Sequence, residues 1–377
     1  MQLSVVILNY NVRYFLELCL HSVTRAIQDL DAEIIVIDNN SPDASCAMVK
    51  EKFSSVKLIE NKKNVGFAKA NNQAVKIAKG KYVCILNPDT VVTETTFRNC
   101  LKKARSLPNL GVMGVQLMSG KGCFLPESKR NLPTPKVSLF KVFGSRFSHL
   151  APYYATHVRK DDLGKVSILV GAFMFLERRK YLEIDGFDER YFMYGEDIDF
   201  SYSIEKLGYE NYYLGSESII HFKGESSFKN KVYRERFFGA MQLFYKKNFK
   251  SSWLMNGLVF SGIKLASLLR SNKKTSNVVD FSKALLISDV ENLNDEITKV
   301  TQLTSEFTSL EALLEMKLEK EYVCCFLDMN YLSYNEAFQV VRKYENQNVY
   351  FRFLLKSSKF ALGSDSSEGL GIVISYK

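Results

Sequence analysis

Three carboxylates lie close together in a stretch of sequence that is rich in aromatic residues. Glu196, Asp197 and Asp199 belong to GEDIDFSYSIEKLGY, residues 195–209, and aromatic residues precede and follow them. Burying a charge without a partner costs free energy, so acids in apolar company need an explanation. A carboxylate that faces a partly desolvated cleft can act as a general base.

A helix is expected over residues 196–207, and it would place the three acids on different faces. At about 100° per residue, Glu196 lies on the apolar stripe and Asp197 borders it, whereas Asp199 points elsewhere. Acids in a first helical turn also interact favourably with the helix dipole, which accounts well for Asp199. That explanation suits the other two acids less well, so Glu196 and Asp197 are the candidates for catalysis.

A second set of residues could bind a divalent cation. Asp89 ends the apolar run KYVCILNPDT, and a carboxylate oxygen suits Mg²⁺ or Mn²⁺. The Asp of Asn-Pro-Asp can equally be a turn residue. His221 is a candidate second ligand, although a lone histidine in an apolar strand is more often a packed side chain. The hypothesis therefore requires that His221 and Asp89 meet at one edge of the fold.

Polar residues follow several apolar segments of the first hundred residues. LSVVILNYN, AEIIVIDNNSPD and KYVCILNPDT each indicate a buried strand with a polar end, and helical patterns separate them. This alternation predicts a parallel sheet with helices on both faces, in which ligands bind beyond the carboxyl ends of the strands. The three ends carry Asn9, Asn11, Asp38, Asn39, Asn40, Asn87 and Asp89. Asn and Asp also suit turns, an explanation that fits any one strand end better than all three together.

The stretch NVGFAKANN, residues 64–72, is expected to open another helix. Gly66 permits a close approach to the backbone, and a helix N-terminus favours anions. An ordinary capped helix start remains an open alternative. Further along the chain, VSILVGAFMFLERR is expected to form one strand that passes through Gly171.

The remaining regions are less regular. Residues 120–165 are expected to form a long ordered loop or lid, and residues 231–250 a basic helix. Residues 252–269 are apolar but interrupted by Asn256 and Lys264, so an interfacial helix and a buried packing helix both remain open. After a linker at 269–277, residues 278–377 predict a small second α/β unit without phosphate-loop glycine spacing.

The net charge of +10 is spread unevenly over the 377 residues. Residues 278–377 hold 10 Lys and Arg against 15 Asp and Glu, which leaves a net charge of +15 on residues 1–277. Such a surplus suits an anionic partner: nucleic acid, an anionic membrane surface or a phosphate-bearing substrate. The seven cysteines form no CxxC pair and no secretory signal is evident, which favours a reducing compartment.

Together these motifs resemble the family-2 inverting glycosyltransferases, especially the branch of rhamnosyltransferases. The matching segments follow the family's order over residues 1–245: VVILNYN, VIDNNSPD, NVGFAKANN, ILNPDT, VGAFMFLERR, GFDERYFMYGEDIDFSYSIEKLGY and IIHFKGESS. The resemblance implies a GT-A fold, with a mixed and mostly parallel sheet, over residues 1–250. A membrane-proximal helix and linker would follow at 251–277, and a small Rossmann-like α/β accessory domain at 278–377.

The resemblance also implies roles for individual residues. Asp197 would be the base, with Glu196 beside it, while Asp89 and His221 would lie at a metal site for Mg²⁺ or Mn²⁺. A nucleotide-sugar donor would be bound by Asn9, Asn11, Asp38, Asn40, Asn64, Gly66, Asn71 and Asn87, with Asp38 holding the nucleotide base. The family's broader pattern is Asp-x-Asp, and this sequence departs from it with Asn87 at the first position, although Asn-Pro-Asp is usual in this branch.

The implied reaction transfers a sugar, rhamnose in this branch, to a lipid-linked or polysaccharide acceptor. It would take place in the cytoplasm, at the inner face of the cell membrane, without a nucleic-acid partner. It requires that Asp38, Asp89 and Asp197 open onto one cavity, walled by the aromatic residues around the acids. A non-catalytic nucleotide- or nucleic-acid-binding protein and a nucleotidyltransferase remain alternatives. The C-terminal unit lies outside the resemblance and is expected to bind a partner or to regulate.

Overall fold

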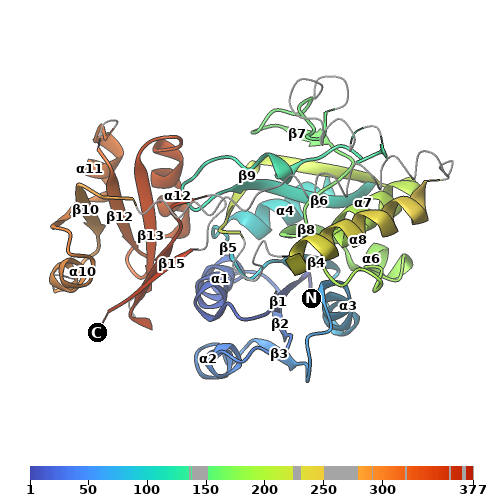
Figure 1. Cartoon of the computed structure of the whole chain (residues 1–377), viewed down its shortest axis with the longest axis horizontal. Helices are drawn as coiled ribbons and strands as arrows, with labels where there is room; N and C mark the ends of the chain where they lie inside the picture. The colour runs from blue at the N-terminus through green and yellow to red at the C-terminus, as the bar shows by residue number, and fades with distance from the viewer. Residues whose placement is uncertain are drawn as a thin grey trace.

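Two sheets with helices packed against them make up the chain (Figure 1). The computed structural model describes residues 1–135, 137, 152–223, 231–249, 279–290, 292–318, 321–355, 358–366 and 371–376. The strands of the first sheet lie between residues 3 and 221, and those of the second between residues 283 and 375. Both sheets alternate with helices along the chain, so the predicted α/β class is confirmed.

The first sheet has the order β3-β2-β1-β4-β8-β6-β9-β5, and β7 pairs with β9. Its strands are β1 (Leu3–Asn9), β2 (Ala32–Asp38), β3 (Lys57–Glu60), β4 (Tyr82–Leu86), β5 (Thr90–Val91), β6 (Leu110–Met118), β7 (Leu163–Lys165), β8 (Phe173–Glu177) and β9 (Glu210–His221). The four strands β3, β2, β1 and β4 are parallel, whereas β8 is antiparallel to both of its neighbours. The carboxyl ends of the parallel strands therefore meet at one edge, as expected.

Helices with one apolar face cover this sheet. They are α1 (Arg13–Ala26), α2 (Ser45–Lys52), α3 (Phe67–Ile77), α4 (Thr96–Arg105), α6 (Arg178–Glu183), α7 (Glu196–Lys206) and α8 (Lys231–Asn248), with a short 3₁₀ turn η1 at Pro126–Ser128. In α1, for example, Leu16, Cys19, Leu20 and Val23 are fully buried in the same core cluster as β1. Their spacing of three and four residues is the periodicity of one helix face.

The expected strand over VSILVGAFMFLERR is shorter than predicted. Regular pairing begins only at Phe173, in β8. The preceding backbone instead makes irregular contacts: Ile168 exchanges hydrogen bonds with Arg130, Leu169 N–H donates to Ser201 Oγ, and Gly171 N–H donates to Asp197. The apolar pattern is real, but these side-chain acceptors replace a neighbouring strand, so the ladder ends.

The second sheet has the order β11-β10-β12-β13-β14-β15. Its strands are β10 (Lys283–Ile287), β11 (Ser305–Phe307), β12 (Val323–Asp328), β13 (Val349–Leu355), β14 (Phe360–Gly363) and β15 (Ile372–Ser375), and its helices are α10 (Leu293–Thr301), α11 (Leu310–Glu315) and α12 (Tyr334–Lys343). The first four strands in chain order are parallel and the last two antiparallel. A capping box between Ser333 and Glu336 begins α12.

The two sheets share one apolar cluster. Phe222, which directly follows β9, packs edge-on against Phe353 of β13 with ring centroids 6.2 Å apart, and Tyr14 of α1 packs against Phe360 of β14. Polar contacts reinforce the junction, because the Glu94 carboxylate accepts the backbone N–H groups of Tyr334 and Asn335 at the start of α12. The C-terminal unit is therefore packed on the first sheet beside α1 and β5 (Figure 1).

Membrane insertion was one possibility for the segment after α8. Among the residues that the structure describes, no helix is both long enough and apolar enough to cross a membrane. The apolar stretch 252–269 and the linker at 269–277 lie outside the described residues.

Candidate active site

A cavity of about 480 Å³ opens at the carboxyl edge of the first sheet. Asn64, Asn87 and Pro88 line one part of it, and Glu196 and Asp197 line another. Its volume is in the range of small-molecule sites, roughly 300–1,000 Å³. Asn87 and Pro88, which precede Asp89, thus line the same cavity as Asp197. Asp38, Asp89 and His221 are not among its lining residues, so the expected opening of Asp38 and Asp89 onto this cavity is not observed.

Asp197 lies in the first turn of α7, and protein groups hold its carboxylate firmly. Its Oδ2 accepts hydrogen bonds from Arg130 Nη2 at 2.6 Å and from the Gly171 N–H at 3.1 Å, and its Oδ1 accepts the Ile198 N–H at 2.8 Å. The Asp197 side chain is 11% exposed. A polar side chain this buried needs such partners, and the three donors hold it in one orientation.

Arg130 was not predicted from the sequence. It follows η1, and its backbone is fixed by paired hydrogen bonds with Ile168. Burial alone would lower the pKa of Arg130, but the neighbouring Asp197 carboxylate raises it above its ordinary value. Arg130 is 67 positions from Asp197, so no local pattern could have revealed the pair.

Glu196 lies beside Asp197 but in a different state. Burial raises the pKa of Glu196 to about 8, and the nearby charge of Asp197 adds to the effect. Its Oε2 atom is buried without a hydrogen-bond partner in the described structure. Two adjacent carboxyl groups whose environments differ in this way divide into one neutral and one ionised group, which suits Glu196 as the neutral member near pH 7.

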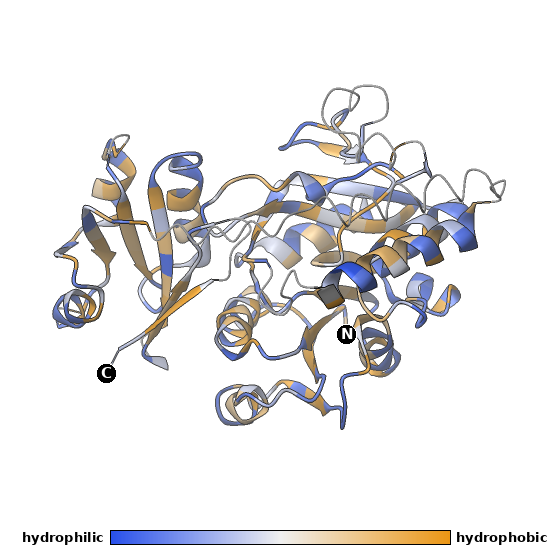
Figure 2. Ribbon diagram, in the orientation of Figure 1, coloured by the Kyte–Doolittle hydropathy of each residue, from blue (hydrophilic) through white to orange (hydrophobic). Residues whose placement is uncertain are grey.

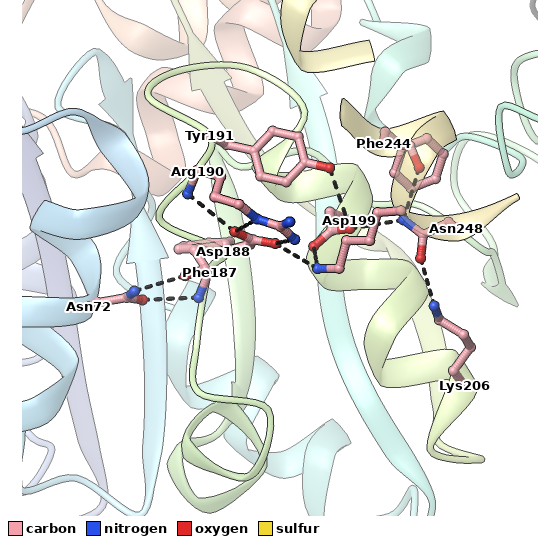
Figure 3. A network of polar contacts seen from close by, with 10 residues as sticks. Asn72, Phe187, Asp188, Arg190, Tyr191, Asp199, Lys206, Phe244 and Asn248 are labelled. Atoms are coloured by element: carbon pink, nitrogen blue, oxygen red, sulfur yellow. Dashed lines mark hydrogen bonds and ion pairs between the residues drawn. The ribbon is translucent and has the colours of Figure 1, made fainter. Parts of the chain in front are cut away.

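Asp199 lies in the first turn of α7, where an acid interacts favourably with the helix dipole, as expected. It does point away from the cavity, but it is only 3% exposed. Lys247 and Asn248 of α8 contact its carboxylate at 2.7 and 3.0 Å (Figure 3). The packing of α8 over this face of α7 was not predicted.

Asp89 and His221 meet, as the cation hypothesis requires. His221 Nε2 lies 3.3 Å from Asp89 Oδ1, and each side chain is at most 10% exposed. The backbone explains the approach, because Thr90 of β5 pairs with His221 of β9. His221 is therefore not a simple packed histidine, since its Nε2 faces a carboxylate at the cavity edge.

The residues present fit a divalent cation. His221 Nε2 and Asp89 Oδ1 face each other, and an imidazole with a carboxylate is a donor set that suits Mn²⁺. Adjacent ligands of an octahedral ion with bonds of about 2.1 Å lie about 3.0 Å apart, close to the observed spacing. No cluster of three His, Cys, Asp or Glu side chains occurs among the described residues, so a bound ion would need further ligands from a substrate or water.

The start of α3 is occupied by protein groups. The Phe67 N–H donates to the Phe192 carbonyl at 2.7 Å, and the Gly66 N–H donates to Asn64 Oδ1. Gly66 has a φ of +87°, and a Cβ there would lie 2.5 Å from the Phe192 oxygen, so glycine is required for this contact. The capped helix start, left open above, describes this segment better than an open anion site.

The other predicted donor residues divide into two groups. Asn64 and Asn87 line the cavity, together with Asn39 and Tyr10. Asp38 lies behind them, where its carboxylate accepts Asn9 Nδ2 and the Ser41 N–H and hydroxyl groups. The residues absent from the cavity lining are Asn9, Asn11, Asp38, Asn40, Gly66 and Asn71.

Several cavity residues were missed in the sequence. They are Glu127, Arg130, Tyr153, Tyr154 and Lys223, together with Tyr233, Phe237 and Met241 of α8. Lys223 forms an ion pair with Glu127. The basic and aromatic composition of residues 120–165 signalled the tyrosines in general, but nothing in the spacing identified them.

Comparisons with known proteins agree with this architecture. Residues 4–184 match the model of the family described as Glycosyl transferase family 2. The chain is 26% identical to N-acetylglucosaminyl-diphospho-decaprenol L-rhamnosyltransferase of Mycobacterium tuberculosis over 60% of this chain and 77% of that protein. It is 25% identical to Rhamnosyltransferase WbbL of Escherichia coli over 45% of this chain and 66% of that one.

A solved structure is also similar. Mannosyltransferase PcManGT from Pyrobaculum calidifontis, in complex with GDP-Man and Mn²⁺, has a TM-score of 0.48 and 17% identity, covering 72% of this chain and 76% of that one. The family match and the acid-lined cavity at the sheet edge define a glycosyltransferase. More particularly, residues 4–184 form a Glycosyl transferase family 2 domain, and rhamnosyltransferases are among the proteins to which the chain is similar.

Proposed function

We propose that this protein transfers a sugar, with inversion, from a nucleotide-sugar to an acceptor carried on a lipid diphosphate. The observation that carries the proposal is the cavity, because Asp197 lines it together with Asn87 and Pro88, the two residues that precede Asp89. A base for the acceptor and a site for the leaving diphosphate must lie within one substrate's reach.

The donor would lie along the carboxyl ends of the parallel strands. Tyr10, Asn39, Asn64 and Asn87 present polar and aromatic groups there. Asp38 would act on the nucleotide indirectly, by holding Asn9 and Ser41 in place. The rhamnosyltransferase relatives favour an activated rhamnose as the donor.

Asp89 and His221 would hold a divalent cation, Mg²⁺ or Mn²⁺. When bound, such an ion supplies electrostatic stabilisation to the departing nucleoside diphosphate. Mn²⁺ accompanies GDP-Man in the similar mannosyltransferase structure. The spacing between Asp89 Oδ1 and His221 Nε2 supports the site in this chain independently of that neighbour.

Asp197 would take the proton from the acceptor hydroxyl as the hydroxyl attacks the anomeric carbon. Arg130 and Gly171 occupy Oδ2, so Oδ1, which accepts only the Ile198 N–H among the contacts of the described residues, is the atom left to receive the proton. Glu196, held neutral by burial, adds no second negative charge beside the base. One displacement on the face opposite the leaving group inverts the configuration.

The acceptor is proposed from chemistry and from a relative. The Mycobacterium tuberculosis relative is named for an N-acetylglucosaminyl-diphospho-decaprenol. The net charge of +15 on residues 1–277 suits a diphosphate-bearing substrate and an anionic membrane surface. We therefore place the reaction at the cytoplasmic face of the membrane.

A donor panel tests the proposal. The purified full chain is incubated with dTDP-rhamnose, UDP-GlcNAc, UDP-glucose or GDP-mannose, each with Mn²⁺, with Mg²⁺ or with a chelator. We expect one donor to raise the melting temperature in the presence of the ion and to be transferred to a farnesyl-diphosphate-linked GlcNAc. If no nucleotide-sugar binds with either ion, the proposal is wrong.

A further inference from the structure

Helix α8 forms one wall of the cavity. It runs across the front of the first sheet and alternates apolar and charged residues along its length (Figures 1 and 2). Tyr233, Phe237 and Met241 all line the cavity, and their spacing of four residues places them on one helix face. The Tyr233 and Phe237 rings are nearly parallel, at 7° with centroids 6.1 Å apart, and so present aromatic surface of the kind against which sugar rings pack.

This wall stands close to the catalytic end of α7. A Cβ added to Gly195, the residue before Glu196, would lie 3.2 Å from Ala240 of α8. Ala240 and Phe244 are buried in one cluster with Ile198, which follows Asp197. A molecule bound between Asp197 and α8 would have its hydroxyl group within reach of the base. Because Asp197 would deprotonate the acceptor hydroxyl, that molecule would be the acceptor.

A polar network ties the last turn of α8 to α7 and to the loop before it (Figure 3). Lys247 Nζ lies 2.8 Å from Asp188 Oδ2 and 2.7 Å from Asp199 Oδ2. Asn248 Nδ2 donates to Asp199 Oδ1 at 3.0 Å, and Lys206 donates to Asn248 Oδ1 at 2.6 Å. Both oxygens of the buried Asp199 are thus engaged by the same end of α8.

The network fixes the position of the cavity wall that α8 forms. An unpartnered buried carboxylate is costly, so Asp199 holds Lys247 and Asn248 strongly, although Lys247 itself is 29% exposed. Lys247 lies six residues beyond Met241 on the same helix. Fixing the position of Lys247 therefore also fixes the distance between the cavity-lining face of α8 and Asp197. The residues on the donor side of the cavity lie in the segments that follow β1, β2, β3 and β4. They take no part in the contact between Asp199 and the end of α8.

We propose that α8 is the acceptor wall of the site, and that Asp188 and Asp199 set its position by clamping Lys247 and Asn248. The inference rests on the proposed function and deepens it, because it assigns the acceptor sugar to the surface of Tyr233 and Phe237. Lys247 and Asp199 are positioning residues that touch no reacting atom. Loosening the clamp raises the Michaelis constant for the acceptor and leaves the donor constant unchanged.

The test compares Lys247→Met with Lys246→Met. The control removes a neighbouring lysine of α8 that is exposed, and methionine keeps the apolar stem in both variants. Hydrogen exchange by mass spectrometry is measured on the full chain without substrate. We expect the amides of α8 to exchange at least tenfold faster in Lys247→Met, and at the wild-type rate in Lys246→Met. Equal exchange in the two variants overturns the clamp, and this readout needs no donor or acceptor.

Steady-state transfer then tests the wall, with farnesyl-diphosphate-linked GlcNAc as acceptor and the nucleotide-sugar found in the donor panel. We expect the acceptor KM to rise about tenfold in Lys247→Met and in Phe237→Ala, with the donor KM within twofold of wild type. Faster exchange in Lys247→Met with an unchanged acceptor KM overturns the wall assignment. Absence of transfer by the wild-type protein counts against the proposed acceptor, and the exchange result still decides the clamp.

Discussion

Acids end strands in both sheets, but the two edges differ in what lies opposite them. In the first sheet, Asp89 faces His221, and the two residues before Asp89 line a cavity together with Asp197 of α7. In the second sheet, Asp328 ends β12 and is 1% exposed, with its oxygens taken by Ser288 Oγ and the Asn330 N–H within the same edge. A polar residue at the end of a strand therefore predicts that the residue lies at the carboxyl edge of the sheet. Whether that edge forms a functional site depends on the charged side chains that other elements place opposite it.

The path of the chain explains the difference. After β8 in the first unit, helices α7 and α8 lie across the carboxyl edge of the sheet. Charged and aromatic side chains of these helices therefore face the strand ends from the opposite side. After β13, the second unit continues its own sheet with antiparallel β14 and β15. The second sheet contributes to the first through its packing on Phe222, next to His221.

The largest expected effect compares the two edges directly. Asp197→Asn should lower transfer by about 10²–10⁴-fold, because an amide cannot accept the acceptor proton. Its affinity for the nucleotide-sugar should persist in a binding assay. Asp328→Asn should change transfer by no more than about twofold while lowering stability by about 1 kcal/mol. If both variants lose transfer equally, the distinction between a catalytic edge and a structural edge fails.

The second effect concerns the ion pair that distinguishes the catalytic edge. Arg130→Met leaves the Asp197 carboxylate buried without its partner, which should lower the free energy of unfolding by about 3–5 kcal/mol. Urea denaturation measures the loss. The double variant Arg130→Met/Asp197→Asn should recover part of it, because the unpaired charge is gone. Equal losses in the single and double variants would show that Arg130 acts through its packing alone.

A smaller effect tests whether the two units are one cooperative body. Phe353→Leu removes the ring contact with Phe222 and should cost about 1–2 kcal/mol. Because both units share the apolar cluster, calorimetry should show one transition that moves to lower temperature as a whole. A second transition that appears while the first stays in place would mean that the units unfold separately.

The most gradual effect, smallest when taken per pH unit, is a dependence of stability on pH from Glu196. Its pKa rises on folding from an ordinary 4.5 to about 8, so the folded state holds the proton more tightly and loses stability as pH increases through that range. Asp197 and Arg130 are the charged groups that act on it. Glu196→Gln should remove this slope, gaining about 1 kcal/mol per pH unit over wild type between pH 5 and 8.

Chemical denaturation at a series of pH values measures this gain. Glu189→Gln is the matched control, because the Glu189 side chain is 45% exposed and its loss should leave the slope unchanged. Stability profiles for Glu196→Gln and wild type that run parallel from pH 5 to 8 would contradict the buried, neutral state of Glu196.

Much of the catalytic edge was predictable from local patterns. The polar ends of β1, β2 and β4, the start of α7 and the approach of His221 to Asp89 all match expectation. Arg130 and the cavity face of α8 did not emerge, because each depends on contacts between residues far apart in the chain. The contact between Asp199 and Lys247 did not emerge for the same reason, since the two residues lie 48 positions apart.

The sequence by itself determined the alternation of apolar strands and amphipathic helices, and with it the edge at which polar residues gather. Periodicity and strand ends are local properties, so one chain suffices to read them. Only the tertiary structure decided which acid is paired, which is neutral and which clamps a helix. Those states depend on burial and on partners within a few ångströms, and only the packing of distant segments brings such partners together.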